Sequence, residues 1–137
     1  MEKPYILHMF TPSKNVSPFD VNMAYDAGFD AVIPYTDLGL DQVAAYTQDA
    51  IFSRGPTGVR RTGIFLGGRD IGVAYDMMDA VRRSMVPPFE VSVFADPSGA
   101  FTTAAAMVAS VERQLRKNFE RGLEGCEVVL LLSLIHI

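Results

Sequence analysis

The sequence predicts an α/β fold: an open, mostly parallel sheet with helices on both faces. Along its 137 residues, short apolar runs of strand length alternate with longer segments of helical periodicity. This alternation is typical of β-α-β units, in which each helix returns the chain to the same end of a parallel sheet. Hydrophobic residues make up 49% of the chain and charged residues 20%, a composition typical of globular domains. The predicted strands are Ile6–Phe10, Ala31–Tyr35, Thr62–Leu66, Phe89–Phe94 and Glu127–Leu131.

The first predicted helix has a recognisable start and end. Ser17 can cap it, Pro18 suits the first helical position, and Asp20 is the acid that would complete a capping box with Ser17. The helix then runs to Ala27, where Gly28 can adopt the left-handed conformation that ends many helices. Asp20 can instead contact a ligand, and the sequence leaves both roles open.

Three further helices are predicted at about residues 40–53, 71–85 and 101–119. A loop at residues 54–58 follows the first of them, and Pro87–Pro88 ends the second. The small and apolar front half of the last helix is expected to be buried, and its charged back half to be solvated. The apolar stripes of the first two are Val43, Ala44, Thr47 and Ile51, and Val73, Met77, Ala80, Val81 and Ser84.

Charge and composition exclude several classes of protein. The formal charge of -4 argues against a partner such as nucleic acid, which needs a basic footprint. The single Cys126 cannot form an intrachain disulfide, so a cytoplasmic location is expected. The first residues lack the apolar stretch and cleavage site of a signal peptide. The most apolar run, residues 128–137, is ten residues long and too short to cross a bilayer, so no membrane partner is expected.

Several common catalytic and metal-binding motifs are absent. His8 and His136 have no carboxylate or Cys neighbours at ligand spacing, so no metal is expected, and His8 is interpreted as a structural histidine. The sequence contains no Walker A loop, no G-x-S-x-G elbow and no G-x-G-x-x-G dinucleotide fingerprint. Acidic neighbours disfavour a thiolate at Cys126, which we interpret as a packing or surface residue.

The remaining candidates for a binding site are four loops that follow predicted strands. In a parallel sheet these loops share the edge at which open α/β folds bind ligands. Their hydroxyls, carboxylates, glycines and aromatic rings suit a flat, polar-rimmed heterocycle better than a simple phosphate. The loops are residues 11–20, 34–37, 67–70 and 95–103.

Two of these loops have more than one explanation. Gly67–Gly68 can permit a tight turn or the close approach of a ligand. The run from Asp96 to Gly99 is an ordinary turn sequence. Thr102 and Thr103, however, place polar groups at the N-terminus of an apolar helix, a position that binds carbonyl or anionic groups.

Longer stretches of the chain resemble a known family. From about residue 6 to residue 131 the sequence is similar to the N-terminal domain of the bacterial NAD(P)-dependent methylene-tetrahydromethanopterin dehydrogenases. The S-P-F-D and F-T-T-A-A-A elements are the most specific parts of the resemblance. The stretches that carry it are HMFTPSKNVSPFDVNMAYDAGFDAVIPYTDLGL, TQDAIFSRG, IFLGGRD and VPPFEVSVFADPSGAFTTAAAMVA.

The resemblance implies that this chain is one half of a two-domain oxidoreductase located in the cytoplasm. Enzymes of this family act in one-carbon (formaldehyde) oxidation in methylotrophs. In that family a tetrahydromethanopterin-type substrate lies in a cleft, and NAD or NADP is bound mainly by a second, Rossmann domain. The enzyme oxidises methylene-tetrahydromethanopterin to the methenyl cation by passing a hydride to NAD(P)+, without a metal. The full-length protein is expected to be a homo-oligomer, and this chain alone is expected to be inactive.

The resemblance also implies roles for individual residues. Asp20 is the candidate catalytic residue, because a carboxylate near the ring would stabilise the developing cation. The folate relatives that are also cyclohydrolases use a Tyr-x-x-x-Lys motif, and Tyr46 with Ala50 is the nearest pattern here, so cyclohydrolase activity is not expected. The candidate substrate-binding residues are Ser17, Phe19, Asp20, Tyr35, Ser98, Thr102 and Thr103.

The end of the chain departs from the family pattern. We expect a pterin-side domain with its connecting helix at residues 1–122 and the start of a truncated dinucleotide-binding domain at residues 123–131. The hexapeptide at residues 132–137, LSLIHI, is what the codons CTG TCT CTT ATA CAC ATC would encode, and those codons are the mosaic-end adapter of transposon-based sequencing libraries. We therefore expect those six residues to be translated adapter.

Two other functions remain open from the sequence. The chain can be a stand-alone small-ligand-binding or regulatory α/β domain, or a flavodoxin-like phosphate binder that uses Gly67 and Gly68. An independent DNA read past the codon for Leu131 separates the first of these from the dehydrogenase. A Gly-rich turn there supports the dehydrogenase, and a natural stop codon supports the stand-alone domain.

Overall fold

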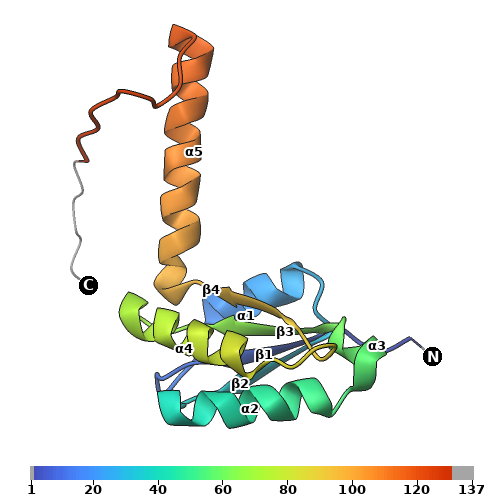
Figure 1. Ribbon diagram of the computed structural model, residues 1–137. Helices are drawn as coiled ribbons and strands as arrows, with labels where there is room; N and C mark the ends of the chain where they lie inside the picture. Colours follow the sequence, from blue (N-terminus) through green and yellow to red (C-terminus); the bar gives the residue numbers. More distant parts are fainter. Residues whose placement is uncertain (1, 131–137) are drawn as a thin grey trace. The chain divides into compact units, whose positions relative to one another are not determined.

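The computed structural model describes residues 2–130 and divides the chain into two compact units, residues 1–102 and residues 103–137. The first unit contains all four strands and most of the helices (Figure 1). Its elements are β1 (Ile6–Phe10), α1 (Pro18–Asp26), β2 (Ala31–Tyr35), α2 (Leu40–Phe52), α3 (Gly55–Val59), β3 (Thr62–Leu66), α4 (Ile71–Ser84), β4 (Ser92–Ala95) and a short 3-10 turn (Pro97–Gly99). Helix α5 (Ala100–Phe119) begins there and continues into the second unit.

The four strands form one open sheet in the order β2-β1-β3-β4, and every neighbouring pair is parallel. β1 pairs on both sides at one level, because Ile6 is opposite Ala31 in β2 and opposite Thr62 in β3. The predicted α/β fold with an open parallel sheet is confirmed.

Helices cover both faces of this sheet, as predicted, with α2 and α4 on one face and α1 on the other (Figure 1). Side chains of successive strand residues point to opposite faces, so β1 contributes to both layers. Leu7 and Met9 pack with Ala24 of α1. The larger core under α2 and α4 contains Phe10, Leu38, Val43, Ile51, Val59, Ile64, Leu66, Met77, Val81, Val91 and Ala95.

The start of α1 differs from the prediction in its cap. Ser17 has an extended backbone and Pro18 opens the helix, but the Ser17 side chain makes no capping hydrogen bond. The predicted capping box between Ser17 and Asp20 is therefore absent, which leaves the Asp20 carboxylate free for other contacts. At the other end the helix finishes at Asp26, and Gly28 adopts the expected left-handed backbone with φ of 93°.

Two further boundaries were predicted wrongly. Residues 54–58, expected as a loop, contribute to the short helix α3, which Pro56 can enter because a first-turn residue needs no backbone N–H partner. The fourth strand begins at Ser92 rather than Phe89, because Phe89 donates its backbone N–H to Val86 in a tight turn. Only from Ser92, opposite Gly63, does the chain pair with β3.

The second unit holds the greater part of α5, and no residue of that helix is buried among the described residues. The prediction that the front half of α5 is buried is therefore wrong within the part of the chain that the structure describes. Met107 and Val108, for example, are 37% and 49% exposed. In the back half of the helix, the Arg116 guanidinium forms an ion pair with the Glu112 carboxylate one helical turn earlier, and the N–O distance is 2.6 Å.

The end of the described chain contains no strand. Residues 127–130, expected to begin a fifth strand, have no strand assignment, because a strand needs a partner for its hydrogen-bond ladder and none is present among residues 2–130. Leu131 and the predicted adapter at residues 132–137 lie outside the described residues. The division into domains after residue 122 stays a prediction. Between residues 2 and 130 no helix combines the length and apolarity needed to span a membrane.

The core under α2 and α4 gives a direct test of the packing. Ile51 is fully buried in α2, whereas Ile71 at the start of α4 is 46% exposed. Ile51→Ala should lower the free energy of unfolding by about 2–5 kcal/mol because it leaves a cavity, and Ile71→Ala by less than about 1 kcal/mol. Urea denaturation monitored by circular dichroism measures both, and equal losses would contradict this assignment of the core.

Candidate functional site

The strand order creates a topological switch point at the carboxyl edge of the sheet, the position at which open α/β folds form a crevice. From β1 the chain passes through α1 to β2 on one side, and then through α2 and α3 to β3 on the other side of β1. Ligands of open α/β sheets bind at such a switch point, outside the carboxyl ends of the two strands whose connections diverge. Here these strands are β1 and β3, which are followed by Asp20 at the start of α1 and by Gly67–Gly68.

Asp20 and Gly67 approach each other closely at this crevice. A Cβ atom at position 67 would lie 3.6 Å from the Asp20 Oδ2 atom, which is ordinary van der Waals contact, so the loop after β3 lies directly beside the carboxylate. Gly68 has φ of 118° and faces Pro12, which favours glycine on conformational grounds alone. Position 67 thus lies next to the carboxylate, while position 68 makes the turn.

Asp96, directly after β4, is the second carboxylate of the site and is only 7% exposed. Its Oδ1 atom accepts hydrogen bonds from the backbone N–H groups of Phe101 at 2.8 Å and Thr102 at 3.2 Å. Its Oδ2 atom accepts a third hydrogen bond from the Thr102 hydroxyl at 2.5 Å. The donors at the start of α5, expected to meet a ligand, are therefore already occupied by a carboxylate of the chain itself.

The two carboxylates influence each other electrostatically. Partial burial raises the pKa of Asp20, and the nearby negative charge of Asp96 raises this pKa further. Within residues 2–130 neither carboxylate takes part in an ion pair. The crevice therefore presents negative charge that lacks a cation of its own, an arrangement that favours a positively charged ligand or a developing positive charge.

Ser98 connects the loops after β3 and β4. Its hydroxyl donates a hydrogen bond to the backbone carbonyl of Gly68 at 3.2 Å. Ser98 adopts a left-handed backbone with φ of 55°, and Gly99 follows with φ of 68°. This turn directs the chain back over Asp96 into α5, so that Ser98 belongs to the same edge as Gly68.

The structure does not bring all predicted residues together. Tyr35 ends β2 but points to the face covered by α2, where its hydroxyl meets the His8 Nδ1 atom at 3.1 Å. Asp20 belongs to α1 and therefore lies on the other face of the sheet. The partner found for His8 agrees with its interpretation as a structural histidine.

The other predicted contacts lie at the ends of helices. Ser17 and Phe19 are exposed at the start of α1, with Phe19 66% exposed, so both are available to a ligand over the crevice. Thr102 is held by Asp96. Thr103 is exposed and is the first residue of the second unit.

Asp96 is the functional candidate that the sequence reasoning missed. The run Asp-Pro-Ser-Gly is typical of a turn, and this pattern alone does not identify its acid as a partner of the helix that follows. The sequence does offer one indication of this role. Asp96 precedes a Pro and a short turn at the start of a helix, a position at which side-chain hydrogen-bond acceptors are favoured. Across residues 2–130, no group of three or more His, Cys, Asp or Glu residues is arranged to hold a metal ion.

The three hydrogen bonds of Asp96 predict a large effect of its removal. Asp96→Ala leaves the first N–H groups of α5 and a Thr hydroxyl without their acceptor, and we expect it to cost about 2–3 kcal/mol of unfolding free energy. Asp70, which caps α4 through one bond to the Val73 N–H at 2.9 Å, is the matched control. Asp70→Ala should cost about 1 kcal/mol in the same urea titration. Equal costs would contradict the special role of Asp96.

The raised pKa of Asp20 predicts a pH-dependent effect on stability. A carboxyl group whose pKa is higher in the folded state binds its proton more tightly there, so stability falls as pH rises from the ordinary value of 3.8 through the folded pKa. Asp20→Asn should therefore raise stability at pH 7, by at most about 1 kcal/mol for a partly exposed group, and this gain should shrink toward pH 4.

Asp41 provides the control for this experiment, because it also lies in the first turn of a helix. Asp41→Asn removes a favourable interaction with the helix dipole and should lower stability slightly. Thermal unfolding of the three proteins between pH 4 and pH 7 tests the contrast. A loss of stability for Asp20→Asn at pH 7 would show that its carboxylate is not under electrostatic strain.

Comparison with known proteins identifies the family to which this site belongs. A family model described as "Methylene-tetrahydromethanopterin dehydrogenase, N-terminal" matches residues 18–98, which is more than half of the chain. The matched region begins at α1 and ends just after β4, so it includes Asp20, Gly67 and Asp96.

Two relatives from Methylorubrum extorquens agree with this match. An NAD(P)-dependent methylenetetrahydromethanopterin dehydrogenase is 55% identical over 125 residues, covering 91% of this chain and 42% of that protein. The bifunctional protein MdtA is 38% identical over 106 residues, covering 77% of this chain and 37% of that protein. The chain thus spans about two fifths of the length of each relative. With the family model matched over most of the α/β unit, the chain belongs to the methylene-tetrahydromethanopterin dehydrogenase N-terminal family.

Proposed function

We propose that this chain forms the substrate-binding side of an enzyme that oxidises methylene-tetrahydromethanopterin to methenyl-tetrahydromethanopterin with NAD(P)+. The observation that carries the proposal is the pair of carboxylates, Asp20 and Asp96, at the switch point of a domain of this family. In this proposal the pterin lies over the carboxyl edge of the sheet, with its one-carbon bridge near Asp20.

The proposed reaction creates positive charge. A C–H bond of the methylene bridge breaks, and the hydride leaves with both electrons to NAD(P)+, which becomes NAD(P)H. The lone pair of a neighbouring ring nitrogen forms the new C=N bond, so the product is a methenyl cation. No proton is taken up or released at the reacting carbon, and the site needs charge stabilisation and alignment rather than a general base.

The electrostatics of the crevice suit this charge change. Burial and Asp96 raise the pKa of Asp20, which means that the ionised carboxylate is destabilised until a cation approaches. Three hydrogen bonds hold Asp96 in place, so its negative charge does not reorient during the reaction. Both carboxylates interact more favourably with the cationic product than with the neutral substrate, and such a difference is what accelerates a reaction.

The described residues do not fit a dinucleotide site. The loop after β3 contains Gly67 and Gly68, but Asp20 lies beside it and would repel a pyrophosphate. Asp70 then caps α4 and occupies the Val73 N–H group, one of the donors that a phosphate would need. This geometry also disfavours the alternative of a flavodoxin-like phosphate binder. We therefore propose that NAD or NADP binds mainly to residues other than those described.

The substrate contacts in this proposal come from the loops around the crevice. Ser17 and Phe19 flank Asp20 at the start of α1, and the exposed ring of Phe19 offers a surface for stacking on a pterin. Ser98 holds the loop after β4 against the loop after β3 through its hydrogen bond to the Gly68 carbonyl. We also propose that the full-length enzyme is a cytoplasmic homo-oligomer, as the family resemblance implies.

A charge-selective binding experiment tests the proposed function. Isothermal titration of the purified chain with methylene- and methenyl-tetrahydromethanopterin should show binding of both and tighter binding of the cationic methenyl form. Asp20→Asn should weaken methenyl binding about tenfold or less and methylene binding much less, because only one form is charged. The chain alone should not reduce NAD(P)+, as judged by absorbance of the reduced nicotinamide.

Asp26→Asn is the matched control, because Asp26 is an exposed acid at the far end of α1. It should leave both affinities unchanged. Absence of pterin binding at millimolar concentration would refute the proposed function. Equal weakening of both forms by Asp20→Asn would refute the role of Asp20 while leaving the substrate class in place.

A further inference from the structure

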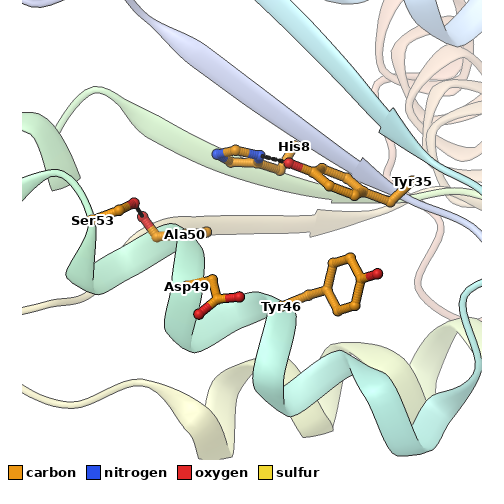
Figure 2. A pocket seen from close by; sticks show the side chains of 6 residues that line it. All are labelled: His8, Tyr35, Tyr46, Asp49, Ala50 and Ser53. Atoms are coloured by element: carbon orange, nitrogen blue, oxygen red, sulfur yellow. Dashed lines mark hydrogen bonds between the residues drawn. The ribbon is translucent and has the colours of Figure 1, made fainter.

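A second cavity lies on the sheet face opposite Asp20, between the β1–β2 edge and α2 (Figure 2). Its volume is about 290 Å³, which is large enough for a small organic molecule. It does not contribute to the proposed pterin site, because its strand residues point toward α2 and Asp20 belongs to α1. The lining residues are His8, Tyr35, Tyr46, Asp49, Ala50 and Ser53.

Aromatic rings form one side of this cavity. The rings of Tyr35 and Tyr46 stand nearly perpendicular, with centroids 5.4 Å apart and an interplanar angle of 82°. His8 continues this wall, because its Nδ1 atom lies 3.1 Å from the Tyr35 hydroxyl oxygen and its ring 5.7 Å from the Tyr35 ring. Figure 2 shows the Asp49 carboxylate beside Tyr46 on the same helix, with His8 and Tyr35 above them in this view. The arrangement is a partial aromatic cage with one carboxylate.

The cavity lining carries a single formal charge. Burial, and to a smaller extent the charge of Arg54, lowers the pKa of His8 below 6.5, so the imidazole is neutral at neutral pH. The pKa of the Tyr35 hydroxyl is raised by burial and then by Tyr46 and Asp49, which keeps that group protonated. Among the six lining residues, Asp49 supplies the one carboxylate, and none of the six is Lys or Arg.

The nearby cation Arg54 does not neutralise Asp49 directly. Its guanidinium donates hydrogen bonds to the Thr62 hydroxyl and to the carbonyl of Arg61, both at 3.0 Å, and to the carbonyl of Pro4 at 2.9 Å. Among residues 2–130, Asp49 takes part in no ion pair. The Ser53 hydroxyl donates at most a long bond of 3.5 Å to the Ala50 carbonyl and keeps its oxygen available as an acceptor.

We propose that this cavity binds the ammonium or guanidinium group of a small organic cation. The aromatic faces of Tyr35 and Tyr46 attract a cation through their quadrupoles. The carboxylate of Asp49 supplies the opposite charge, and the hydroxyl oxygens accept hydrogen bonds from its N–H groups. The volume limits the ligand to one such group with a short apolar body. A free small molecule and a Lys or Arg side chain of a second copy both present this chemistry.

Nuclear magnetic resonance titration of the ¹⁵N-labelled chain tests the site. Methylguanidinium chloride and tetramethylammonium chloride are the probes, and sodium chloride at equal ionic strength is the control. We expect saturable shifts, in the millimolar range for an exposed site, at Tyr35, Tyr46 and Asp49, and none with sodium chloride. Shifts that do not saturate, or that sodium chloride reproduces, would overturn the proposal.

Matched variants identify the groups responsible. Asp49→Asn should weaken binding about threefold to fivefold, whereas Asp76→Asn, which removes an exposed acid from α4, should leave it unchanged. Tyr46→Phe keeps the ring and should retain binding, and Tyr46→Leu should lose most of it. Unchanged affinity in both Asp49→Asn and Tyr46→Leu, with circular dichroism showing folded proteins, would overturn the proposal.

A dilution series distinguishes the two sources of the cation. If a side chain of a second copy occupies the cavity, sedimentation should show self-association that methylguanidinium reduces and Asp49→Asn weakens. If the ligand is a free molecule, the chain should sediment independently of concentration while still binding the probes. Self-association that neither the probe nor Asp49→Asn changes, together with no probe binding, would exclude both sources.

Discussion

The structure depends on the double pairing of β1. Because Ile6 is level with both Ala31 and Thr62, the three adjacent strands end at the same height, at Phe10, Tyr35 and Leu66. The helical crossovers return the chain to the same starting edge each time, so the loops that follow these strands lie at one edge of the sheet. The loops carrying Asp20 and Gly67 come together for this reason, and the pairing of Leu66 in β3 with Ala95 in β4 brings Asp96 to the same edge. The strand register therefore determines where the candidate site lies, and the side chains of the loops determine its chemistry.

Negative charge at this edge has a cost that the fold partly offsets. Asp96 is buried, but three hydrogen bonds replace the water that its carboxylate loses, and the start of α5 receives its acceptor in the same contacts. Asp20 has no such compensation, and burial and Asp96 raise its pKa. One carboxylate is thus structural and fixed, and the other is left available to respond to a ligand. Functional sites commonly carry this kind of local destabilisation.

Much of the fold could be predicted from the sequence, because apolar periodicity reflects burial. Three of the first four strands were predicted with correct bounds, and the four predicted helices to within one or two residues, whereas the short helix α3 was predicted as a loop. The errors occur where tertiary contacts decide. Ala44 and Val73 were assigned to the buried stripes, yet both are exposed, and Ala50 and Ala74 are buried instead. Periodicity fixes a helical face only to within about one residue.

The candidate site was predictable only in part. The rule that ligands meet the carboxyl ends of parallel strands indicates this edge, and it includes Asp20, Gly67 and Ser98, whose loops the structure brings close together. It cannot tell which face of the sheet a strand-end side chain will occupy, since that depends on register, and so Tyr35 was grouped with residues across the sheet. The role of Asp96 depends on the turn at Ser98, a left-handed backbone at a residue that is not glycine. Nothing in the local sequence requires that conformation.

Because side chains alternate along β1, an insertion or deletion in this strand would change the residues on both faces of the sheet. His8 and Phe10 point toward α2, and Leu7 and Met9 toward α1. Adding or removing one residue in the middle of this strand would move the residues beyond it to opposite faces. The imidazole would then enter the apolar layer under α1, and a large apolar side chain would fill the cavity beside Tyr35.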